Sequence, residues 1–250
     1  LAIYAADRVR NVSNVWMGAT MGCCQCHDHK YDPYTMKDFY SLAAFFADVE
    51  GDRLHGSGNS LPTKRPPEIK VHTKRERQRL ATWEAKLAKL PKESPDAQRL
   101  QQQIAQLKKN VRTTMITQAF PPRKMRILPR GNWLDDSGPV VEPAIPESLG
   151  KLDLGQRRGT RLDLANWLTD AKHGAGGLTA RVFANRFWYL LFGVGISNSL
   201  DDFGGQGEPP EHPELLDNLA VEFVESGWNV KHMMKLIVMS RAYRQSSQST

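Results

Sequence analysis

The sequence is poor in cysteine and contains no long apolar run. Its three cysteines lie within residues 23–26, so they cannot build the disulfide framework of a small secreted domain. The nearest approach to a membrane-spanning run, residues 183–196, is interrupted by Asn185 and Arg186 and is shorter than the roughly 18–20 residues that cross a bilayer. We therefore expect no transmembrane segment in this chain.

The chain also lacks a signal peptide and an initiator methionine. Leu1 lies in an amphipathic pattern that looks already under way, and residues 246–250 end without a clear stop. We expect the chain to be a fragment of a longer protein, with its targeting information outside this piece.

What is present indicates a mainly α-helical protein with a sizeable core. Hydrophobic residues make up 40% and charged residues 24% of the 250 residues, an ordinary globular balance. Apolar residues recur at helical spacing in several segments, and Thr35, Ser94 and Thr179 are the expected N-caps. The predicted helices cover residues 1–20, 36–47, 160–168, 178–192, 213–226 and 230–243, with two more between residues 73 and 112.

Five regions follow one another along the chain. Residues 1–50 are expected to form a helical segment, and residues 51–72 a linker rich in Gly, Pro and Ser. Residues 73–112 are expected to form a projecting antiparallel coiled-coil hairpin with a turn at residues 91–95. Prolines break residues 113–150 into a small irregular β region. Residues 151–250 are expected to be a helical C-terminal domain.

The net charge of +7 is concentrated in one segment. Residues 64–130 hold 18 Lys and Arg against 5 Asp and Glu, whereas the remainder holds 16 against 22. Such a segment can bind nucleic acid, an anionic polysaccharide or an acidic partner, but a solvated helical hairpin explains it as well and is favoured here. We keep an anionic polysaccharide as a candidate partner of the hairpin and expect no nucleic acid.

The strongest motif is the run from Cys23 to His27. Cys23-x-x-Cys26-His27 is the attachment signature of a c-type haem. In such a site the two thiols add to the haem vinyl groups and the adjacent histidine coordinates iron. The motif therefore predicts Cys23 and Cys26 as covalent haem-binding residues and His27 as the iron ligand, with Cys24 as a bystander.

Other uses of this cluster stay open. A zinc site could combine Cys23 or Cys24 with Cys26, His27 and His29, although four ligands within seven residues would be tight. A redox dithiol or a local disulfide between Cys23 and Cys26 is a further alternative. His29 remains a possible metal ligand, or a residue that contacts a haem propionate.

A second candidate site lies in a glycine-rich loop at residues 201–210. Its carboxylates could act as acid and base on a sugar, or bind calcium, and they make weak candidates for catalytic residues. The interpretation that we favour is that Asp202 and Glu208 cap helices and fix the loop. The four acidic residues are Asp201, Asp202, Glu208 and Glu211.

Longer motifs resemble a known pair of domains. Residues 22–33, GCCQCHDHKYDP, resemble the C-x-R-C-H-D-H-K-[FY]-D-P signature of planctomycete cytochrome-type proteins, although Gln25 stands where that family commonly has Arg and Cys24 where it often has Ala. Residues 185–188, 202–217 and 236–247 resemble the second block of the same family. These are the paired domains of unknown function 1549 and 1553, here spanning the end of the first domain and the start of the second.

The resemblance implies an exported protein, periplasmic or extracellular, often preceded by another cytochrome c domain. We therefore expect a c-type cytochrome-like protein that binds haem covalently and passes electrons to or from a partner protein or a neighbouring cytochrome domain. The family also implies a link to polysaccharide oxidation or breakdown. The alternatives are an exported non-redox binding or scaffold module with a structural metal or disulfide at the Cys/His cluster, and a carbohydrate-active enzyme that uses the acidic loop.

Overall fold

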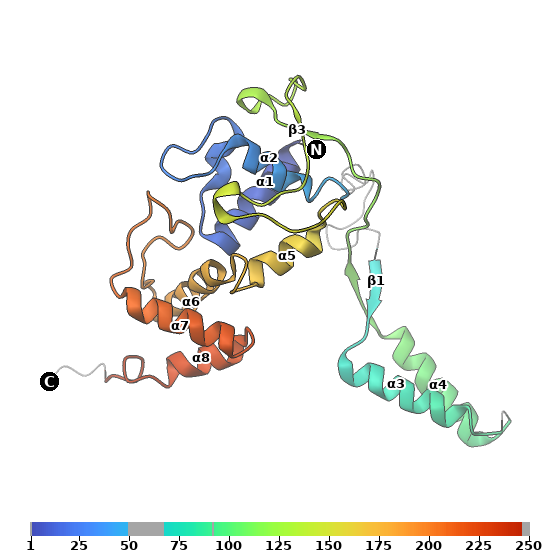
Figure 1. Ribbon diagram of the computed structural model, residues 1–250. Helices are drawn as coiled ribbons and strands as arrows, with labels where there is room; N and C mark the ends of the chain where they lie inside the picture. Colours follow the sequence, from blue (N-terminus) through green and yellow to red (C-terminus); the bar gives the residue numbers. More distant parts are fainter. Residues whose placement is uncertain (1, 50–67, 92, 247–250) are drawn as a thin grey trace, which may run out of the picture. The chain divides into compact units, whose positions relative to one another are not determined.

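A computed structural model describes residues 2–49, 68–91 and 93–246. Within these residues the chain forms eight α-helices and two small two-stranded antiparallel sheets, which confirms the mainly α fold (Figure 1). The chain divides into two compact units. Residues 1–48 and 121–250 form the first, and residues 49–120 form the second.

The first unit begins with two helices that flank the Cys/His motif. α1 (Ala2–Val12) continues into a π-helical turn, Ser13–Met17, which ends at Gly18 with a left-handed φ of 57°. α2 (Met36–Ala44) starts at a capping box, in which the side chains of Thr35 and Asp38 each bond the other's backbone N–H, an arrangement that satisfies two N–H groups at the helix start. The motif lies between them in a 3₁₀ turn, Met21–Gln25.

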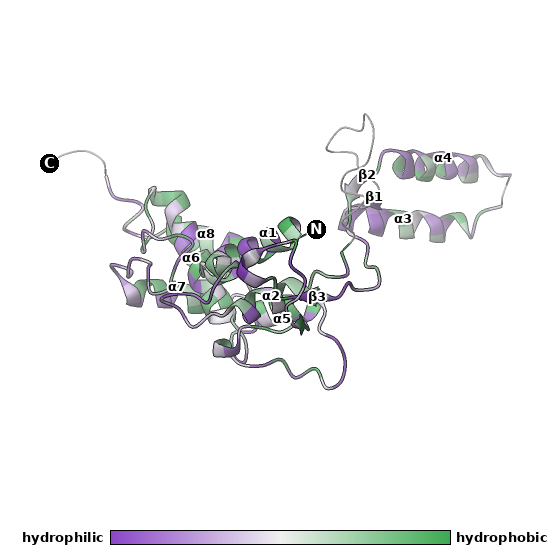
Figure 2. Ribbon diagram, turned by 90° about the horizontal axis from the view of Figure 1, so that it is seen from above, coloured by the Kyte–Doolittle hydropathy of each residue, from purple (hydrophilic) through white to green (hydrophobic). Residues whose placement is uncertain are grey.

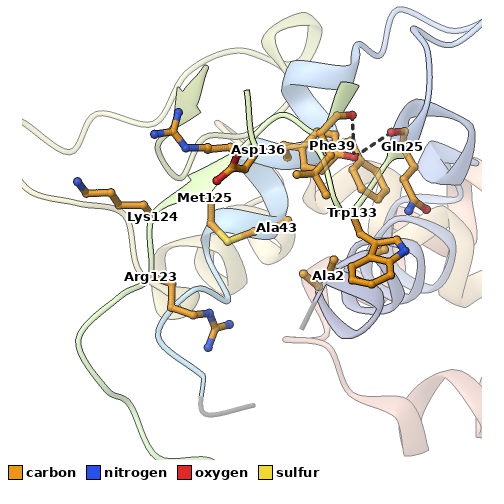
Figure 3. Close-up of a pocket in the computed structure, with 14 residues that line it drawn as sticks. Ala2, Gln25, Phe39, Ala43, Arg123, Lys124, Met125, Trp133 and Asp136 are labelled. Atoms are coloured by element: carbon orange, nitrogen blue, oxygen red, sulfur yellow. Dashed lines mark hydrogen bonds between the residues drawn. The ribbon is translucent and has the colours of Figure 1, made fainter. Parts of the chain in front are cut away.

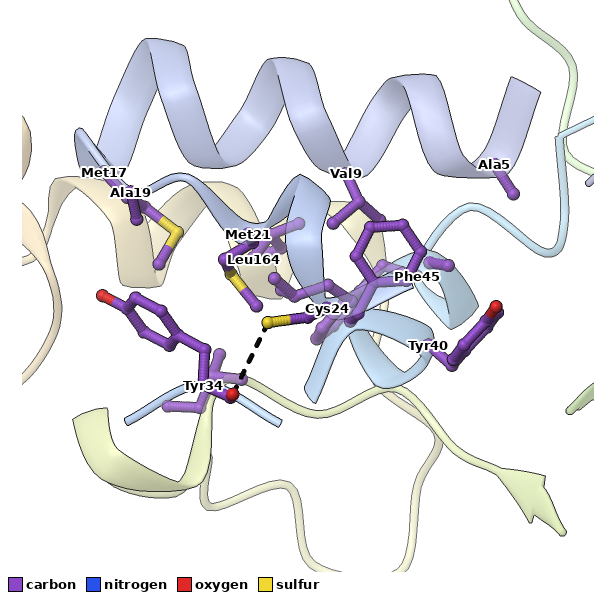
Figure 4. Close-up of a cluster of buried hydrophobic side chains, with 14 of the residues drawn as sticks. Ala5, Val9, Met17, Ala19, Met21, Cys24, Tyr34, Tyr40, Phe45 and Leu164 are labelled. Atoms are coloured by element: carbon purple, nitrogen blue, oxygen red, sulfur yellow. Dashed lines mark hydrogen bonds between the residues drawn. The ribbon is translucent and has the colours of Figure 1, made fainter. Parts of the chain in front are cut away.

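A hydrophobic cluster joins these helices to one much later in the sequence (Figure 4). α5 (Arg161–Thr169), which follows a capping box of Thr160 and Asp163, buries Leu164, Trp167 and Leu168 against the same cluster. Burial of this apolar surface holds the motif segment in place. Its most deeply buried members from the N-terminal helices and turns are Val9, Met17, Met21, Cys24, Phe39, Leu42 and Phe45.

An extended connection leads from residue 121 to α5. β3 (Met125–Arg126) pairs with β4 (Val140–Val141). One 3₁₀ turn, Pro129–Gly131, lies between these strands, and a second, Glu147–Leu149, follows β4. Arg130 and Gly131 both have left-handed backbone conformations. The proline-rich composition predicted this irregular backbone.

Three more helices complete the first unit around a second hydrophobic cluster. They are α6 (Gly176–Phe192), α7 (Pro213–Glu225) and α8 (Val230–Val238), and their cluster is centred on Leu216, Phe223 and Met233. The expected cap at Thr179 is wrong, because α6 begins earlier and buries Thr179 inside the helix. α8 also ends earlier than predicted, in a turn that follows Val238.

The second unit is a helical hairpin on a two-stranded stem. β1 (Glu68–Val71) pairs antiparallel with β2 (Arg112–Met115), although residues 68–71 lie in the stretch expected to be a linker. α3 (Lys74–Leu87) and α4 (Pro95–Lys109) lie side by side (Figure 2) and bury Leu80, Leu100 and Ile104 between them. Ser94 caps α4 as predicted. In the described parts of the chain we find no helix long and apolar enough to cross a membrane.

Candidate functional site: the Cys/His turn and its surroundings

The 3₁₀ turn separates the three cysteines into two environments. The Cys26 N–H donates to the Cys23 carbonyl at 3.3 Å, which closes the turn. Cys23 and Cys26 are exposed free thiols, whereas Cys24 is buried and also free. The Cys24 thiol lies 3.5 Å from the Tyr34 carbonyl, to which it donates (Figure 4). The turn therefore directs one thiol into the core and leaves the two motif thiols at the surface.

Burial makes Cys24 chemically inert. It raises the pKa of the Cys24 thiol to about 12, with the negative charge of Cys23 acting in the same direction. A thiol is reactive only as the thiolate, so Cys24 remains protonated at neutral pH. This supports its predicted role as a bystander and gives it a packing role instead.

The His27 ring is exposed, and one of its nitrogens is anchored. Its Nδ1 lies 2.7 Å from the Asp28 carbonyl oxygen. A carbonyl oxygen can only accept a hydrogen bond, so Nδ1 must carry the proton and donate. The neutral ring then keeps its lone pair on Nε2. Metal-binding histidines commonly have this arrangement, in which the second ring nitrogen donates to a backbone carbonyl.

His29, by contrast, is buried and fully engaged by the protein. Its Nδ1 accepts from the backbone N–H groups of Tyr31, at 3.3 Å, and Asp32, at 2.9 Å. Its Nε2 lies 3.2 Å from the Thr20 hydroxyl. Because Nδ1 accepts these two bonds it is unprotonated, so the Asp32 carboxylate 3.4 Å away is a neighbour and not an ion-pair partner. In this conformation His29 shapes the loop that follows the motif.

The glycine-rich loop packs on the motif segment. The Phe203 N–H donates to the Gly18 carbonyl at 2.7 Å, and the Gly205 N–H donates to Asp32 Oδ1 at 2.7 Å. Gly204 approaches so closely that a Cβ placed on it would lie 2.4 Å from Asp32 Oδ2. This contact was not predicted from sequence. The only signal for it is the glycine pair, which marks a place where another group approaches the backbone closely.

The acidic residues of this loop are spread over separate structural contacts. Asp202 Oδ1 accepts the Gly204 N–H at 2.9 Å, and Glu208 Oε2 accepts from the Asn198 amide at 2.8 Å. Both residues fix the loop, as favoured above, but neither caps a helix. Asp201 and Glu211 are exposed, and Glu211 contributes its backbone N–H to the Ile196 carbonyl.

The residues that the structure describes contain no cluster of side chains that could bind a metal ion through several ligands. Nowhere in residues 2–49, 68–91 and 93–246 do three His, Cys, Asp or Glu side chains gather closely enough to hold a metal ion. Structural zinc takes four protein ligands and catalytic zinc takes three. A c-type haem differs, because the porphyrin supplies four iron ligands and the motif supplies one.

The methionines nearest the motif in sequence lie in the core. Met17 and Met21 are fully buried in the first hydrophobic cluster, and Met36 packs against it. A second axial iron ligand from Met17 or Met21 would require a change in this core.

An open pocket of about 560 Å³ lies beside the motif (Figure 3). α1 contributes Ala2, Ala5 and Ala6, α2 contributes Phe39, Tyr40 and Ala43, and residues between 123 and 136 form the rest of the wall. Gln25, in the middle of the Cys/His motif, also lines it. This pocket could not be predicted from the sequence, because its walls come from segments about 100 residues apart.

Comparison with known proteins identifies two domain families in the chain. Residues 2–51 match PSCyt2, described as a protein of unknown function (DUF1549), and residues 160–250 match PSD1, described as a protein of unknown function (DUF1553). Searches of curated proteins and of solved structures gave no match. The two matched segments include the Cys/His turn and the glycine-rich loop that packs against it. The chain therefore belongs to the proteins that carry a PSCyt2 domain and a PSD1 domain in one polypeptide.

Proposed function

We propose that this protein is an exported c-type cytochrome that carries covalently bound haem at Cys23 and Cys26, ligates its iron through His27, and transfers electrons. Export to the periplasm or beyond is part of the proposal, because the resemblance of residues 22–33 to cytochrome-type proteins implies it. The partner would be another redox protein or a neighbouring cytochrome domain.

The hydrogen bond of His27 carries the proposal. Donation from Nδ1 to the Asp28 carbonyl, at 2.7 Å, fixes the tautomer in which Nε2 has a free lone pair. It also restrains the ring, which lowers the cost of ordering it on iron. A histidine placed directly after Cys26 with the opposite tautomer could not ligate through Nε2 without first exchanging its proton.

The two thiols meet the requirements of haem attachment. Each addition would form one bond between Sγ and a vinyl carbon and pass the thiol hydrogen to the other vinyl carbon, so that no external oxidant or reductant would be consumed. Cys23 and Cys26 are exposed and unpaired in the described structure, and an incoming group can reach them. Cys24 is shielded by burial, which restricts attachment to the outer pair.

The rival uses of the cluster have less support. A zinc site would need His29, both of whose ring nitrogens have protein partners. A structural disulfide would consume both exposed thiols and leave the anchored His27 without a role. In the acidic loop the carboxylates of Asp202 and Glu208 are engaged in local contacts, and no observation favours glycan hydrolysis.

Once bound, haem supplies a one-electron redox centre whose potential depends on its axial ligands, on nearby charges and on burial. The chain would contribute the proximal ligand and the tether. It would also contribute a frame, because α1 and α2 pack in the same hydrophobic cluster as the motif turn and the Gly205 N–H bonds Asp32.

The test is to express the chain with an export signal in a host that matures c-type cytochromes. We expect a Soret band that remains with the protein after acid–acetone extraction, and haem staining on a denaturing gel. The variants Cys23→Ala, Cys26→Ala and Cys23→Ala/Cys26→Ala separate single from double attachment, and His27→Ala removes the axial ligand.

Cys24→Ala is the matched control, since it removes a thiol from the same turn and should leave haem attachment at the level of the unchanged protein. Absence of covalent haem from the correctly exported, folded protein would refute the proposal. If the Cys24→Ala variant lost as much haem as the Cys23→Ala and Cys26→Ala variants, the assignment of Cys23 and Cys26 as the attachment residues would be wrong.

A further inference from the structure

We propose that the pocket between α1, α2 and residues 123–136 receives the haem macrocycle, with Trp133 against the ring and Lys124 beside its carboxylates. This inference rests on the proposed function and extends it, because the attachment motif alone does not say where the porphyrin lies. No sequence pattern and no family match assigns this pocket a ligand.

The pocket reaches the attachment motif through Gln25, the residue before Cys26. The Tyr40 hydroxyl, in the pocket wall, donates to the Gln25 carbonyl at 2.9 Å. On the other side of the turn, a Cβ on Gly131 would lie 2.6 Å from Cys26 Sγ. Gly131 lies two residues before Trp133, which lines the pocket. The sulfur that would tether the haem is thus close to the pocket wall.

A tethered haem needs an apolar surface that the motif itself does not provide. Cys23, Cys26 and His27 are all exposed, so a porphyrin attached there would stay in water unless a neighbouring surface covered it. Burying such an area is favourable in proportion to the apolar surface removed from water. A site near the motif with room and apolar walls is therefore required.

The pocket walls have the necessary size and chemistry. Four alanines from α1 and α2 leave open volume, while Phe39, Met125 and Leu128 add larger apolar surfaces. The volume of about 560 Å³ lies within the range of pockets that hold cofactors. Trp133 is 69% exposed at the rim, and an indole ring in that place can stack on a planar ligand (Figure 3).

Positive charge along one wall complements the two haem carboxylates. Arg123, Lys124 and Arg126 line the pocket, and residues 121–130 contain four basic and no acidic residues. Asp136 also lines the pocket, so its charged side chains are three cations and one carboxylate. This net positive surface would stabilise an anionic group.

The first experiment measures the Soret circular dichroism of haem-loaded Trp133→Ala and Leu134→Ala. An aromatic ring beside the haem couples to its Soret transition. We therefore expect Trp133→Ala to lose about half of the signal or more. Leu134 is the matched control, because it is the adjacent residue, is 72% exposed and lies outside the pocket lining. Its replacement should leave the signal unchanged.

The second experiment measures the reduction potential of Lys124→Glu and Lys151→Glu. Both substitutions add the same charge change to the first unit, but Lys151 lies outside this pocket. A negative charge near the haem stabilises the oxidised iron, so we expect Lys124→Glu to lower the potential clearly more than Lys151→Glu does.

The outcomes separate this inference from the proposed function. Covalent haem with unchanged dichroism in Trp133→Ala and equal potentials in the two lysine variants would overturn the pocket assignment and leave the cytochrome proposal intact. Failure of haem attachment in Trp133→Ala but not in Leu134→Ala, with both proteins folded by far-ultraviolet dichroism, would support it. Absence of covalent haem from the unchanged protein would overturn both.

Discussion

Replacing Gly204 with alanine should destabilise the first unit, because the loop around Gly204 has no space for a methyl group. The added Cβ would lie 2.4 Å from Asp32 Oδ2 and 2.6 Å from Oδ1. Asp32 cannot turn away freely, since its side chain is 8% exposed and its Oδ1 accepts the Gly205 N–H. Either the loop must withdraw or the carboxylate must leave its position.

The expected loss of stability combines two effects. Overpacking a close contact costs about 1–3 kcal/mol, and loss of the charged hydrogen bond to Gly205 costs about 1.5–3 kcal/mol. The two are alternatives in part, because withdrawal of the loop relieves the clash while it breaks the bond. We therefore expect a decrease of about 2–4 kcal/mol in the free energy of unfolding.

Urea unfolding followed by tryptophan fluorescence provides the measurement. With a dependence on urea of about 2 kcal/mol per molar, the midpoint should fall by about 1–2 M. Gly177→Ala is the control, because a Cβ at Gly177 meets nothing within 4 Å on the first turn of α6. Its midpoint should stay or rise, by up to about 1 kcal/mol in stability. A Gly204→Ala midpoint as high as that of the unchanged protein would refute the close contact.

Four other predictions concern the cysteines, Asp32 and the second unit. Without haem, an alkylating reagent at pH 8.5 should label Cys26 but not Cys24 by mass spectrometry. Since burial raises the pKa of Cys24 to about 12 from an ordinary value near 9.0, the unfolded state gains stability as its thiol ionises, and urea midpoints should fall as pH rises from about 9 toward 12. Asp32→Asn should unfold within about 1 kcal/mol of the unchanged protein in urea, because its side-chain oxygen can still accept the Gly205 N–H, whereas Asp32→Ala should lose about 2 kcal/mol. Replacing residues 49–120 with a short Gly/Ser linker should preserve near-ultraviolet circular dichroism of the first unit, since the Arg123 N–H bonds the Ala47 carbonyl and brings the two cut ends together.

Local signals in the sequence predicted most of the helices. The Thr35 cap, the Ser94 cap and Pro95 at the start of α4 act within one helical turn, and such contacts depend only on neighbouring residues. The prediction failed at Thr179, which is buried inside α6, because its N-cap preference gave way to tertiary packing. Helix ends that depend on distant contacts cannot be derived from spacing.

The haem site stays a prediction from the sequence, and the arrangement of the residues around it could not be predicted. The spacing of Cys23, Cys26 and His27 indicated the haem motif, yet the inward turn of His29 depends on bonds to Tyr31 and Asp32 formed only in the folded loop. The contact between Gly205 and Asp32 joins residues 173 positions apart. No periodicity links such residues, so only the three-dimensional structure brings the glycine-rich loop to the motif.

The shared core of α1, α2 and α5 has a consequence for how this protein could be divided. The families of residues 2–51 and 160–250 are separate in sequence, but Leu164, Trp167 and Leu168 fill the same hydrophobic cluster as Val9 and Phe45. Each piece made alone would present an uncovered apolar face to water. The two families should then behave as complementary fragments, which recover a cooperative fold when mixed, rather than as independent modules that can be exchanged.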